Sequence, residues 1–508
     1  MFRFLSPFLI ALLGFAPISV AQKPNILLIY TDDHTHRAVS CYPEAWDWVK
    51  TPNIDALAEK GVRFHHATIG TWCMASRATV LTGLLQHGVE SMKMEGEYPG
   101  STYDPKKCKF WPSTFRANGY TTAQIGKWHT GVDSGFDRDW DYQVVWNRPK
   151  YPANAGNYYY DQQLEINGVP IKVPGYSTDN YTNWAVDFIN GSNRDKKKPW
   201  YLWVCYGAVH GPFTPAERHL KEYPGVTVPI PADIYPPRPG KPAYVNEMEN
   251  WIPGKDGQPE LQGGFKARTV DTQGLHGNTL NDWVRQVHQG VLAIDEGVGK
   301  MIDALKETKQ LNNTLVVFTS DQGMGWGHHG FRHKLGPYDA TIRSPLIFSM
   351  PGTLPEDQVC NSPVGGQDLA PTFFSFAGID LPWEMHGQDL TPQLKKPDTP
   401  RKEPVLMTLT SDQYGSATKK IPDPDQQMLA GVPWWVSLTD KQFKYVRTLT
   451  EGETEELYDL SQDPEELDNL ALNARFREKL VEMRGKAVKE LKRTKAPFLE
   501  SLPGVAAP

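Results

Sequence analysis

Short apolar stretches alternate along the chain with longer stretches whose apolar residues recur at helical spacing. The clearest short stretches carry no charged residue and lie at residues 26–30, 121–125, 201–206 and 315–319. Strands buried on both faces of a parallel sheet have this character, because helices cover both sides of such a sheet. The alternation therefore predicts an α/β fold with a large, mostly parallel sheet flanked by helices.

Start and stop signals, and one long stretch without them, locate further elements. Thr51 is a candidate N-cap before Pro52, and Gly61 is placed to stop the helix that follows. A short strand is expected next, at residues 62–64. Two more helices are predicted, a short one over residues 74–81 that ends near Gly83 and a long one over residues 281–305. Residues 224–278, rich in proline and glycine, are expected to run over the surface and shape a substrate cleft.

Composition changes divide the chain into domains. Residues 392–404 are rich in proline and charge, which is typical of a domain boundary. Beyond them, the pattern indicates a strand over residues 442–449 and a charged amphipathic helix over residues 476–495. We therefore predict a large N-terminal domain over residues 22–391 and a small C-terminal α+β subdomain over residues 405–500.

Residues 1–21 have the features of a cleavable signal peptide. Arg3 gives a basic start, an apolar run follows, and Ser19, Val20 and Ala21 form a small-residue cleavage site. A membrane anchor is the alternative, but the apolar run is short and broken by prolines. No later stretch is long and apolar enough to span a membrane, so we expect a periplasmic or secreted protein.

Net charge and cysteine content narrow the function classes. The net charge of −6 gives no indication of a nucleic-acid partner, so any anion site must be a local basic pocket. The chain has five cysteines, and an odd number leaves at least one thiol unpaired within an exported chain. Either that thiol is an ordinary buried cysteine or it has a chemical role.

Polar residues follow each of the four predicted strands, at the point where the strand ends. In an open parallel sheet, the loops at the carboxyl ends of the strands form the ligand crevice. If the four strands are parallel, these residues therefore meet at one edge of the sheet. They are Asp32 and Asp33, then Lys127 and His129, then His210, and finally Asp321 and Gln322.

Three carboxylates and an amide gathered in this way form an all-oxygen metal site. Hard cations prefer oxygen ligands, and calcium accepts irregular oxygen cages more readily than magnesium does. Taken alone, Asp32 and Asp33 also fit a turn or a helix cap, and Asp321 and Gln322 fit an ordinary turn. Their matching positions after two buried strands favour a Ca2+ site made of these four residues.

Cys73 is placed at the start of the short helix predicted over residues 74–81. Backbone N–H groups at a helix N-terminus favour an anion, and Arg77, four residues on, lies on the same helical face. A nucleophile and a guanidinium then converge on one tetrahedral oxyanion. The alternative is a buried structural cysteine beside a surface arginine. A basic stretch over residues 327–334, which ends in Lys334, either forms a solvated loop or adds cations over the same crevice.

The segment Cys73-Met74-Ala75-Ser76-Arg77 matches the Cys-x-Ala/Pro-x-Arg signature of type I sulfatases. The resemblance spans residues 23 to 471 and implies an alkaline-phosphatase-like fold. Its other matches are Lys23 to Asn25, Asp32 and Asp33, Thr51 to Ala58, Gly126 to His129, Ser320 to Gly323, Lys334, Glu456 to Leu460, Asp463-Pro464 and Asn469 to Ala471. The chain departs from the family at Gln322, where many relatives have asparagine, at Asp339, where they often have glutamate, and at Leu84-Leu85.

The resemblance implies a sulfatase that depends on formylglycine and calcium. A formylglycine-generating maturation enzyme would oxidise Cys73, and the hydrated aldehyde would attack sulfur. Calcium would bind the oxygen at position 73 together with the four ligands predicted above. The implied catalytic set is Cys73 as nucleophile, Arg77, Lys127 and Lys334 as cations on the sulfate, Asp321 as base, His210 as general acid and His129 in breakdown of the hemiacetal.

The expected substrate is a sulfated carbohydrate, a polysaccharide or oligosaccharide such as an algal fragment. An exported sulfatase with 16 tryptophans suggests sugar stacking, although core packing is the commoner role of any single tryptophan. The tryptophans considered for stacking are Trp72, Trp128, Trp326, Trp383, Trp434 and Trp435.

Three alternatives remain open from the residues. A phosphatase or phosphonate monoester hydrolase can share this fold, but it uses a serine or threonine nucleophile and often two metals. A non-catalytic protein that binds sulfated glycans is the second alternative, although the full set of catalytic residue types argues against it. An enzyme with a thiol nucleophile is the weakest of the three.

Overall fold

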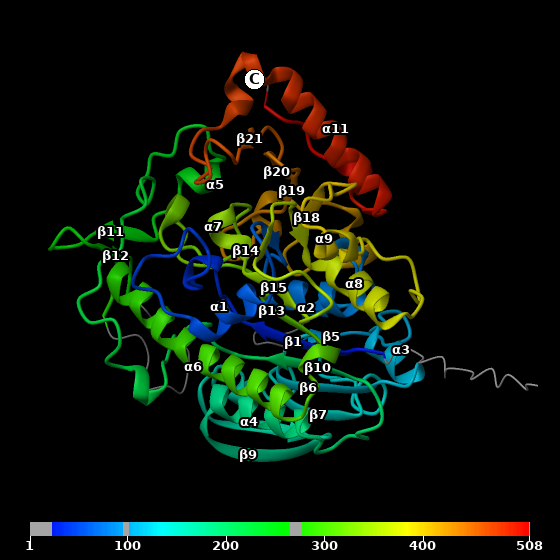
Figure 1. Cartoon of the computed structure of the whole chain (residues 1–508). Coiled ribbons are helices and arrows are strands. Elements are labelled where there is room, and N and C mark those ends of the chain that lie inside the picture. Colours follow the sequence, from blue (N-terminus) through cyan, green and yellow to red (C-terminus); the bar gives the residue numbers. More distant parts are fainter. Residues whose placement is uncertain (1–22, 95–100, 265–276, 507–508) are drawn as a thin grey trace, which may run out of the picture.

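A ten-stranded sheet forms the centre of the computed structural model, which describes residues 23–94, 101–264 and 277–506 (Figure 1). Its strands, in spatial order, are β16 (Gln358–Cys360), β2 (Gly61–Phe64), β15 (Leu346–Ser349), β13 (Thr314–Ser320), β1 (Asn25–Thr31), β10 (Trp200–Cys205), β6 (Thr121–Trp128), β7 (Tyr142–Asn147), β8 (Tyr160–Ile166) and β9 (Val169–Tyr176).

The four predicted buried strands are present and are parallel neighbours. Strand β1 lies between β13 and β10, with Ile26 opposite Leu315 on one side and Tyr201 on the other. Strand β6 continues the parallel set next to β10, and β7 follows β6. The antiparallel pairs lie toward the two edges of the sheet, where β2, predicted over residues 62–64, runs against β15. The predicted α/β fold with a large, mostly parallel sheet is confirmed.

Helices cover both faces of the sheet because alternate residues of each strand point to opposite sides. Leu27 and Ile29 of β1 belong to the core under α1 (Pro52–Glu59), α4 (Ser177–Ile189) and α6 (Leu280–Glu307). Leu28 belongs to the opposite core, which contains residues of α2 (Cys73–Thr82), α3 (Pro112–Ala117) and α8 (Leu369–Ala377). The three helices predicted in this part of the chain therefore sandwich the sheet.

Two of these helices begin or end on the predicted signals. Helix α2 ends at Gly83, which adopts a left-handed φ of 70°. Helix α1 follows Thr51, but Lys60 caps it and Gly61 already opens β2. Helix α6 begins in a capping box in which Thr279 and Asp282 bond each other's backbone N–H groups.

A second sheet of four antiparallel strands forms the C-terminal part. Its strands are β18 (Val405–Leu409), β19 (Trp435–Thr439), β20 (Phe443–Thr448) and β21 (Glu455–Asp459). Helix α11 (Arg477–Arg493), red in Figure 1, packs on it through Leu480, Met483 and Leu491. The strand and the helix predicted here are both present, and a smaller C-terminal α+β unit is confirmed, whereas the domain boundaries at residues 391 and 405 stay predictions.

Short elements complete the described chain. They are β3 (Ala67–Thr68), β14 (Arg343–Ser344) and β17 (Val364–Gly365), which form a small sheet, β4 (Lys93–Met94), β5 (Ser101–Thr102), β11 (Trp251–Pro253), β12 (Pro259–Leu261), α5 (Ala243–Asn246), α7 (Asp339–Ile342), α9 (Thr391–Lys395) and α10 (Pro424–Gln427). Within residues 224–264, only α5, β11 and β12 are regular, so the described part of this predicted excursion is mostly loop; its role in a cleft stays a prediction.

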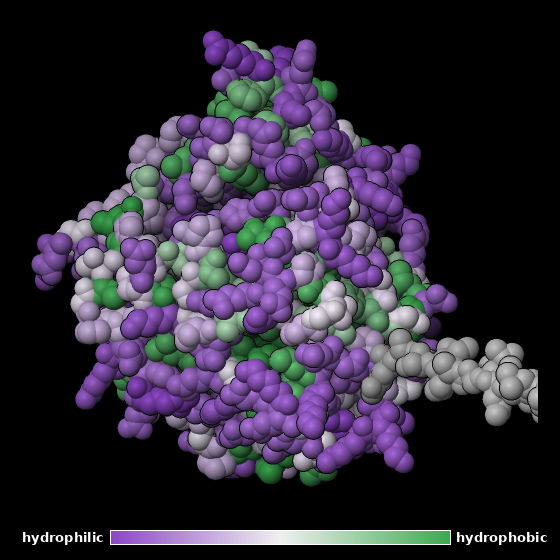
Figure 2. Space-filling model, in the orientation of Figure 1, coloured by the Kyte–Doolittle hydropathy of each residue, from purple (hydrophilic) through white to green (hydrophobic). Residues whose placement is uncertain are grey.

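The surface character and the helices of the protein can be compared with the expectation of an exported protein without a membrane span. The face in Figure 2 is mainly hydrophilic, with hydrophobic residues scattered in small groups. Among the described residues, no helix combines the length and apolar character needed to cross a bilayer. The predicted signal peptide over residues 1–21 lies outside the described residues.

Candidate active site

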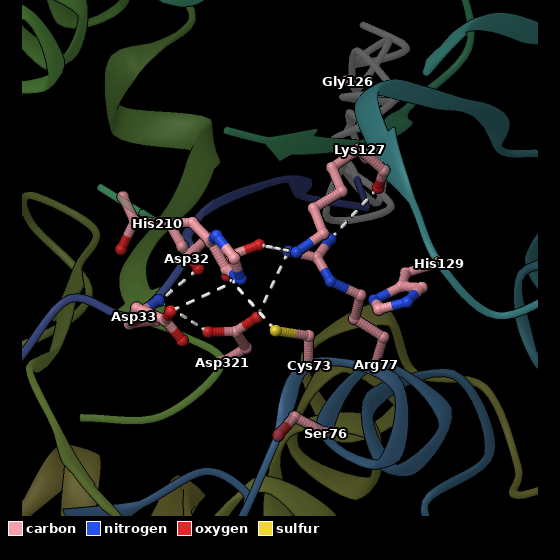
Figure 3. A network of polar contacts seen from close by, with 12 residues as sticks. Asp32, Asp33, Cys73, Ser76, Arg77, Gly126, Lys127, His129, His210 and Asp321 are labelled. Carbon is pink, nitrogen blue, oxygen red and sulfur yellow. Dashed lines mark hydrogen bonds and ion pairs between the residues drawn. The ribbon is translucent and has the colours of Figure 1, made fainter. Parts of the chain in front are cut away.

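The three carboxylates predicted as metal ligands lie together at the carboxyl edge of the sheet (Figure 3). Strand β1 is in register with β13 up to Thr31 and Ser320, so Asp32 and Asp321 follow at neighbouring positions. The backbone N–H of Asp33 donates to Asp321 Oδ1 at 2.9 Å, which ties the two strand ends together. Four buried residues each place one possible ligand atom within 4.8 Å of the others: Asp32, Asp33, Asp321 and Cys73.

Cys73 enters this cluster as the first residue of α2. Its Sγ lies 3.3 Å from Asp32 Oδ1 and 3.1 Å from the Nζ of Lys334. Burial, followed by the charges of Asp32 and Asp321, raises the pKa of the Cys73 thiol to about 12. An unmodified thiol at this position is therefore protonated at neutral pH and is a poor nucleophile.

Three cations from three separate segments of the chain point at the carboxylates. The NH2 of Arg77, on α2, donates to Asp32 Oδ2 at 3.1 Å and to Asp321 Oδ2 at 3.4 Å. Lys127, at the end of β6, forms an ion pair with Asp32, and both side chains are fully buried. Lys334 Nζ lies 2.7 Å from Asp33 Oδ1. The alternative of a surface arginine at position 77 is wrong, because Arg77 is completely buried.

The cluster holds its carboxylates in unequal states. For Asp32, burial raises the pKa, but Lys127, His210 and Arg77 outweigh it and hold the pKa well below its usual value. For Asp321, burial and then the charge of Asp32 raise the pKa to about 7. Burial also raises the pKa of Asp33 against the pull of Lys334. Further positive charge among these oxygens would stabilise the ionised forms, as a divalent cation does.

Gln322 reaches the cluster with its amide turned the other way from the prediction. Its Nε2 donates to Asp33 Oδ1 and lies 3.7 Å from Cys73 Sγ. Its Oε1 accepts a hydrogen bond from the Ser76 hydroxyl at 3.3 Å. An oxygen ligand at this position therefore requires a half-turn of the amide, after which Nε2 faces the Ser76 hydroxyl and donates to it, while that hydroxyl keeps its bond to the carbonyl of Trp72. The sequence could not specify the direction of the amide, because its partners come from distant segments.

The two predicted histidines occupy different places in the site. His210 lies at the carboxylates, with Nε2 3.7 Å from Asp33 Oδ2 and Nδ1 2.7 Å from the carbonyl of Gly211. His129 lies beside Arg77 on the side away from Asp33 (Figure 3), and Arg148 NH1 approaches its Nδ1 at 3.2 Å. Burial lowers the pKa of both imidazoles, with help from Lys334 at His210 and from Arg148 at His129.

Of the basic stretch at residues 327–334, only one end contributes to the site. Lys334 points into the carboxylate cluster, as one alternative predicted. His329 is buried and pairs instead with Asp233 at 2.6 Å. Past this stretch, Arg343 pairs with Glu44 and lies away from the carboxylates.

Asp339, another residue at which the chain departs from the family pattern, belongs to a separate buried ionic network. Its Oδ2 lies 2.7 Å from His66 Nε2, and its Oδ1 lies 2.8 Å from Lys444 Nζ. Glu466 Oε1 lies 2.8 Å from the same Lys444 nitrogen. The network joins the N-terminal part of the chain to the C-terminal sheet and does not add a cation to the crevice.

Most tryptophans considered for sugar stacking are buried. Trp128, Trp434 and Trp435 are fully buried, and Trp326 is 2% exposed, so these four pack in the interior. Trp72 is 6% exposed and meets His129 edge to face. Residues that sequence reasoning did not find are Arg148, beside His129, and Tyr158, which stacks on His210. The run of three tyrosines at residues 158–160 was visible, but nothing in it points to a histidine 52 positions away.

The sheet, with a helix N-terminus and a buried carboxylate cluster at its carboxyl edge, defines a hydrolase of the alkaline-phosphatase-like fold. The family model for sulfatases matches residues 24–379, and the chain belongs to this family. It is accordingly a sulfuric ester hydrolase.

Individual relatives agree with this assignment over nearly the whole chain. An N-acetylglucosamine-6-O-sulfatase from Bacteroides thetaiotaomicron is 28% identical over 507 residues, covering 91% of this chain and 85% of the relative. A protein solved in complex with its substrate D-glucosamine-2-N,6-O-disulfate has a TM-score of 0.76 and 25% identity, with coverage of 93% and 98%. The phosphonate monoester hydrolase of Agrobacterium radiobacter has a TM-score of 0.69, but at 21% identity this likeness shows the fold alone; coverage is 93% and 96%.

Proposed function

We propose that this sulfatase removes the 6-O-sulfate from glucosamine units of a sulfated polysaccharide or oligosaccharide. The observation that carries the reaction is the position of Cys73, at the N-terminus of α2 and within reach of three carboxylates and Lys334. The sugar and the sulfated position are supported by the N-acetylglucosamine-6-O-sulfatase relative and by the solved glucosamine-disulfate complex.

Calcium fits the donor set at this edge of the sheet. Asp32, Asp33 and Asp321 offer carboxylate oxygens within one ion's reach, and Gln322 offers an amide oxygen after a half-turn of its side chain. With formylglycine in place of the Cys73 thiol, these donors are all oxygen atoms, which suit a hard cation, and an irregular cage suits calcium. When bound, calcium supplies Lewis acidity toward a sulfate oxygen and a fixed position for the group at residue 73.

The proposed nucleophile is formylglycine at position 73, produced by a maturation enzyme of the host. Its hydrate has two hydroxyl groups on one carbon, of which one attacks sulfur and expels the alcohol, and the other loses its proton so that sulfate leaves and the aldehyde returns. Asp321 is our candidate to accept the proton of the attacking hydroxyl. His129 is proposed to assist the final elimination, acting from beyond Arg77.

The chain's own cations bind and orient the sulfate. Arg77 and Lys127 are held by Asp32 on one side of the cluster, and Lys334 is held by Asp33 on the other. Because these ion pairs fix the cations before substrate arrives, little reorganisation is needed when charge develops on the sulfate oxygens. Burial strengthens this stabilisation, since water is excluded.

His210 is the proposed general acid for the leaving alcohol, with Lys334 beside it. The Nδ1–H of its ring donates to the carbonyl of Gly211 at 2.7 Å, which leaves Nε2 to face the cluster. Nε2 carries a transferable proton only when the ring is an imidazolium, and the negative charge of a bound sulfate ester favours that form against the lowering of the pKa by burial and Lys334. That proton passes to the ester oxygen as the S–O bond breaks, and the ring is left neutral with its proton on Nδ1. General acid catalysis of this kind contributes roughly 10²–10⁴-fold.

A substrate panel tests the sugar and the position. Protein produced with a formylglycine-generating enzyme is incubated with glucosamine and N-acetylglucosamine sulfated at the 6-position, with their 3-O-sulfated isomers and with a 2-O-sulfated hexuronate. Released sulfate is measured by ion chromatography, with Cys73→Ala as the blank. We expect release from the 6-O-sulfates alone; equal release from the other isomers would refute the proposed position.

A second assay separates the sulfatase from its two rivals. A phosphonate monoester hydrolase shares the fold, so 4-nitrophenyl sulfate and 4-nitrophenyl phenylphosphonate are compared at equal concentration. A preference for the phosphonate would overturn the proposal. Binding of 6-O-sulfated glucosamine without any turnover by the matured protein would instead identify a glycan-binding protein.

We also propose that the protein is exported after cleavage near residue 21. None of its five cysteines, which all lie in described segments, forms a disulfide. Four of them are buried, which protects them from oxidation outside the cytoplasm. N-terminal sequencing of the protein recovered from the periplasm or medium of its host tests the cleavage site.

A further inference from the structure

Tyr158 packs flat against His210. It lies in the segment between β7 and β8 and is 3% exposed. The two rings are 4.2 Å apart between centroids, and their planes differ by only 6°. Among the described residues, His210 contacts no other aromatic ring, so Tyr158 is the ring that supports the face of its imidazole.

The same ring approaches two cations of the site. Lys127 Nζ lies 5.2 Å from the centroid of Tyr158, and the guanidinium carbon of Arg148 lies 4.9 Å from it. Both distances are in the range of cation–π attraction, which is strengthened when the cation is buried. Arg148 in turn touches His129. One tyrosine therefore contacts or adjoins groups on both sides of the carboxylate cluster.

The surroundings fix the tyrosine itself. Its backbone carbonyl accepts a hydrogen bond from the Ser177 hydroxyl at 2.7 Å. Trp146 meets the ring edge to face, with centroids 4.7 Å apart. The bare backbone of Gly207 lies close to both rings, since an added Cβ would come to 3.3 Å from Tyr158 and from Trp146. A close-packed ring of this kind makes a rigid support.

We propose that Tyr158 is a positioning residue for His210. The bond from Nδ1 to Gly211 fixes one atom of the imidazole but still allows the ring to tilt about it. Stacking on Tyr158 removes that tilt and so fixes the direction in which Nε2 points. The inference rests on the proposed role of His210 as general acid to the leaving alcohol.

The test compares two sulfate esters whose leaving groups differ in how much they need an acid. 4-Nitrophenol leaves readily without protonation, whereas a sugar alcohol does not. The variant Tyr158→Met fills much of the space without a flat ring. Tyr158→Phe keeps the ring that makes the contacts described above. Tyr142→Met is the matched control, because Tyr142 stacks on Phe188 in the core with planes 10° apart.

If the general acid is displaced, the fall in kcat/KM should be large for the ester with the poorer leaving group and small for the other. For Tyr158→Met we expect kcat/KM on the 6-O-sulfated sugar to fall about 10²-fold, within the range of general acid catalysis, and on 4-nitrophenyl sulfate less than about 3-fold. Tyr158→Phe should stay within about 3-fold of wild type on both. Tyr142→Met should leave kcat/KM on both esters close to the wild-type values. An equal loss on both esters in Tyr158→Met would show a merely structural role and overturn the proposal.

A double-mutant cycle gives the second readout. If Tyr158 acts through His210, then Tyr158→Met should cost nothing further in a His210→Ala background. Additive losses would contradict the inference while leaving the sulfatase activity established. Thermal unfolding checks that each variant is folded, and Tyr158→Leu replaces the methionine variant if that one is not. A matured wild-type protein that cleaves no sulfate ester would refute the proposed function, and this inference with it.

Discussion

Replacing Arg77 by methionine removes a fully buried cation while keeping most of the side chain's length. Its guanidinium bonds Asp32 at 3.1 Å, Asp321 at 3.4 Å and the carbonyl of Lys127 at 3.1 Å. Without it, Asp32 keeps its ion pair with Lys127, but Asp321 loses the one cation that pairs with it within the described segments. The variant therefore leaves a buried carboxylate without a compensating charge.

The size of the effect follows from burial. Removing one partner of a buried ion pair costs about 3–5 kcal/mol, because the remaining charge stays out of water. Part of this cost disappears if Asp321 takes up a proton, or if calcium sits among the carboxylates. We therefore expect the stability loss to be larger in EDTA than in calcium. Because the variant no longer has the Arg77 guanidinium to neutralise charge on the sulfate oxygens, kcat/KM should also fall by about 10²–10³-fold.

Arg218 provides the matched control. It too bridges two carboxylates, Asp179 at 2.8 Å and Glu296 at 2.6 Å, but its side chain is 40% exposed. Exposed pairs of this kind contribute about 0–1 kcal/mol, so Arg218→Met should be nearly silent. Urea unfolding midpoints of both variants, with calcium and with EDTA, make the comparison. Equal losses in the two variants, or no effect of EDTA on Arg77→Met, would refute the reasoning.

Three further predictions concern the metal site and the scaffold. Asp33→Asn should weaken calcium binding to the EDTA-stripped protein by at least about 10–100-fold in calorimetry, and unchanged affinity would remove Asp33 from the ligand set. In calcium-free protein, burial and Asp32 raise the pKa of Asp321 to about 7, so the folded state holds a proton that the unfolded chain releases above pH about 4. Stability should thus fall as pH rises from about 4 to 7, and Asp321→Asn should flatten this slope in thermal unfolding. Thr279→Ala, which breaks the capping box of α6 with Asp282, should cost about 1 kcal/mol in urea unfolding without changing sulfate release.

The parallel core of the fold could be predicted from the sequence because its strands are uniformly buried. Once β1, β6, β10 and β13 are parallel, the polar residues at their carboxyl ends must share one edge of the sheet. This geometry brings Asp32, Lys127 and Asp321 close together. The sheet edges were not predictable in this way. Strand β2 runs antiparallel to β15, and nothing in residues 62–64 specifies that partner.

The finer details of the site depend on contacts between distant segments. The amide of Gln322 lies between Asp33 and Ser76, which is 246 residues away in the sequence, and residue types alone do not show which amide atom meets the carboxylates. The partner of His210, Tyr158, comes from a loop with no periodic pattern. Conversely, His329 belongs to the basic stretch that the sequence could place over the crevice, but it is buried and pairs with Asp233 instead. Residue types and strand ends therefore predict which residues lie at the site. The direction in which each side chain points depends on its packing in the folded structure.

The most direct test of the account follows position 73 and the activity in the same samples. Preparations matured to different extents by the formylglycine-generating enzyme are analysed by mass spectrometry of the peptide that contains residue 73, and their sulfate release is measured with saturating calcium. The account predicts that activity rises in proportion to the fraction of aldehyde and extrapolates to zero for the thiol. Full activity in a preparation that retains the Cys73 thiol would contradict it.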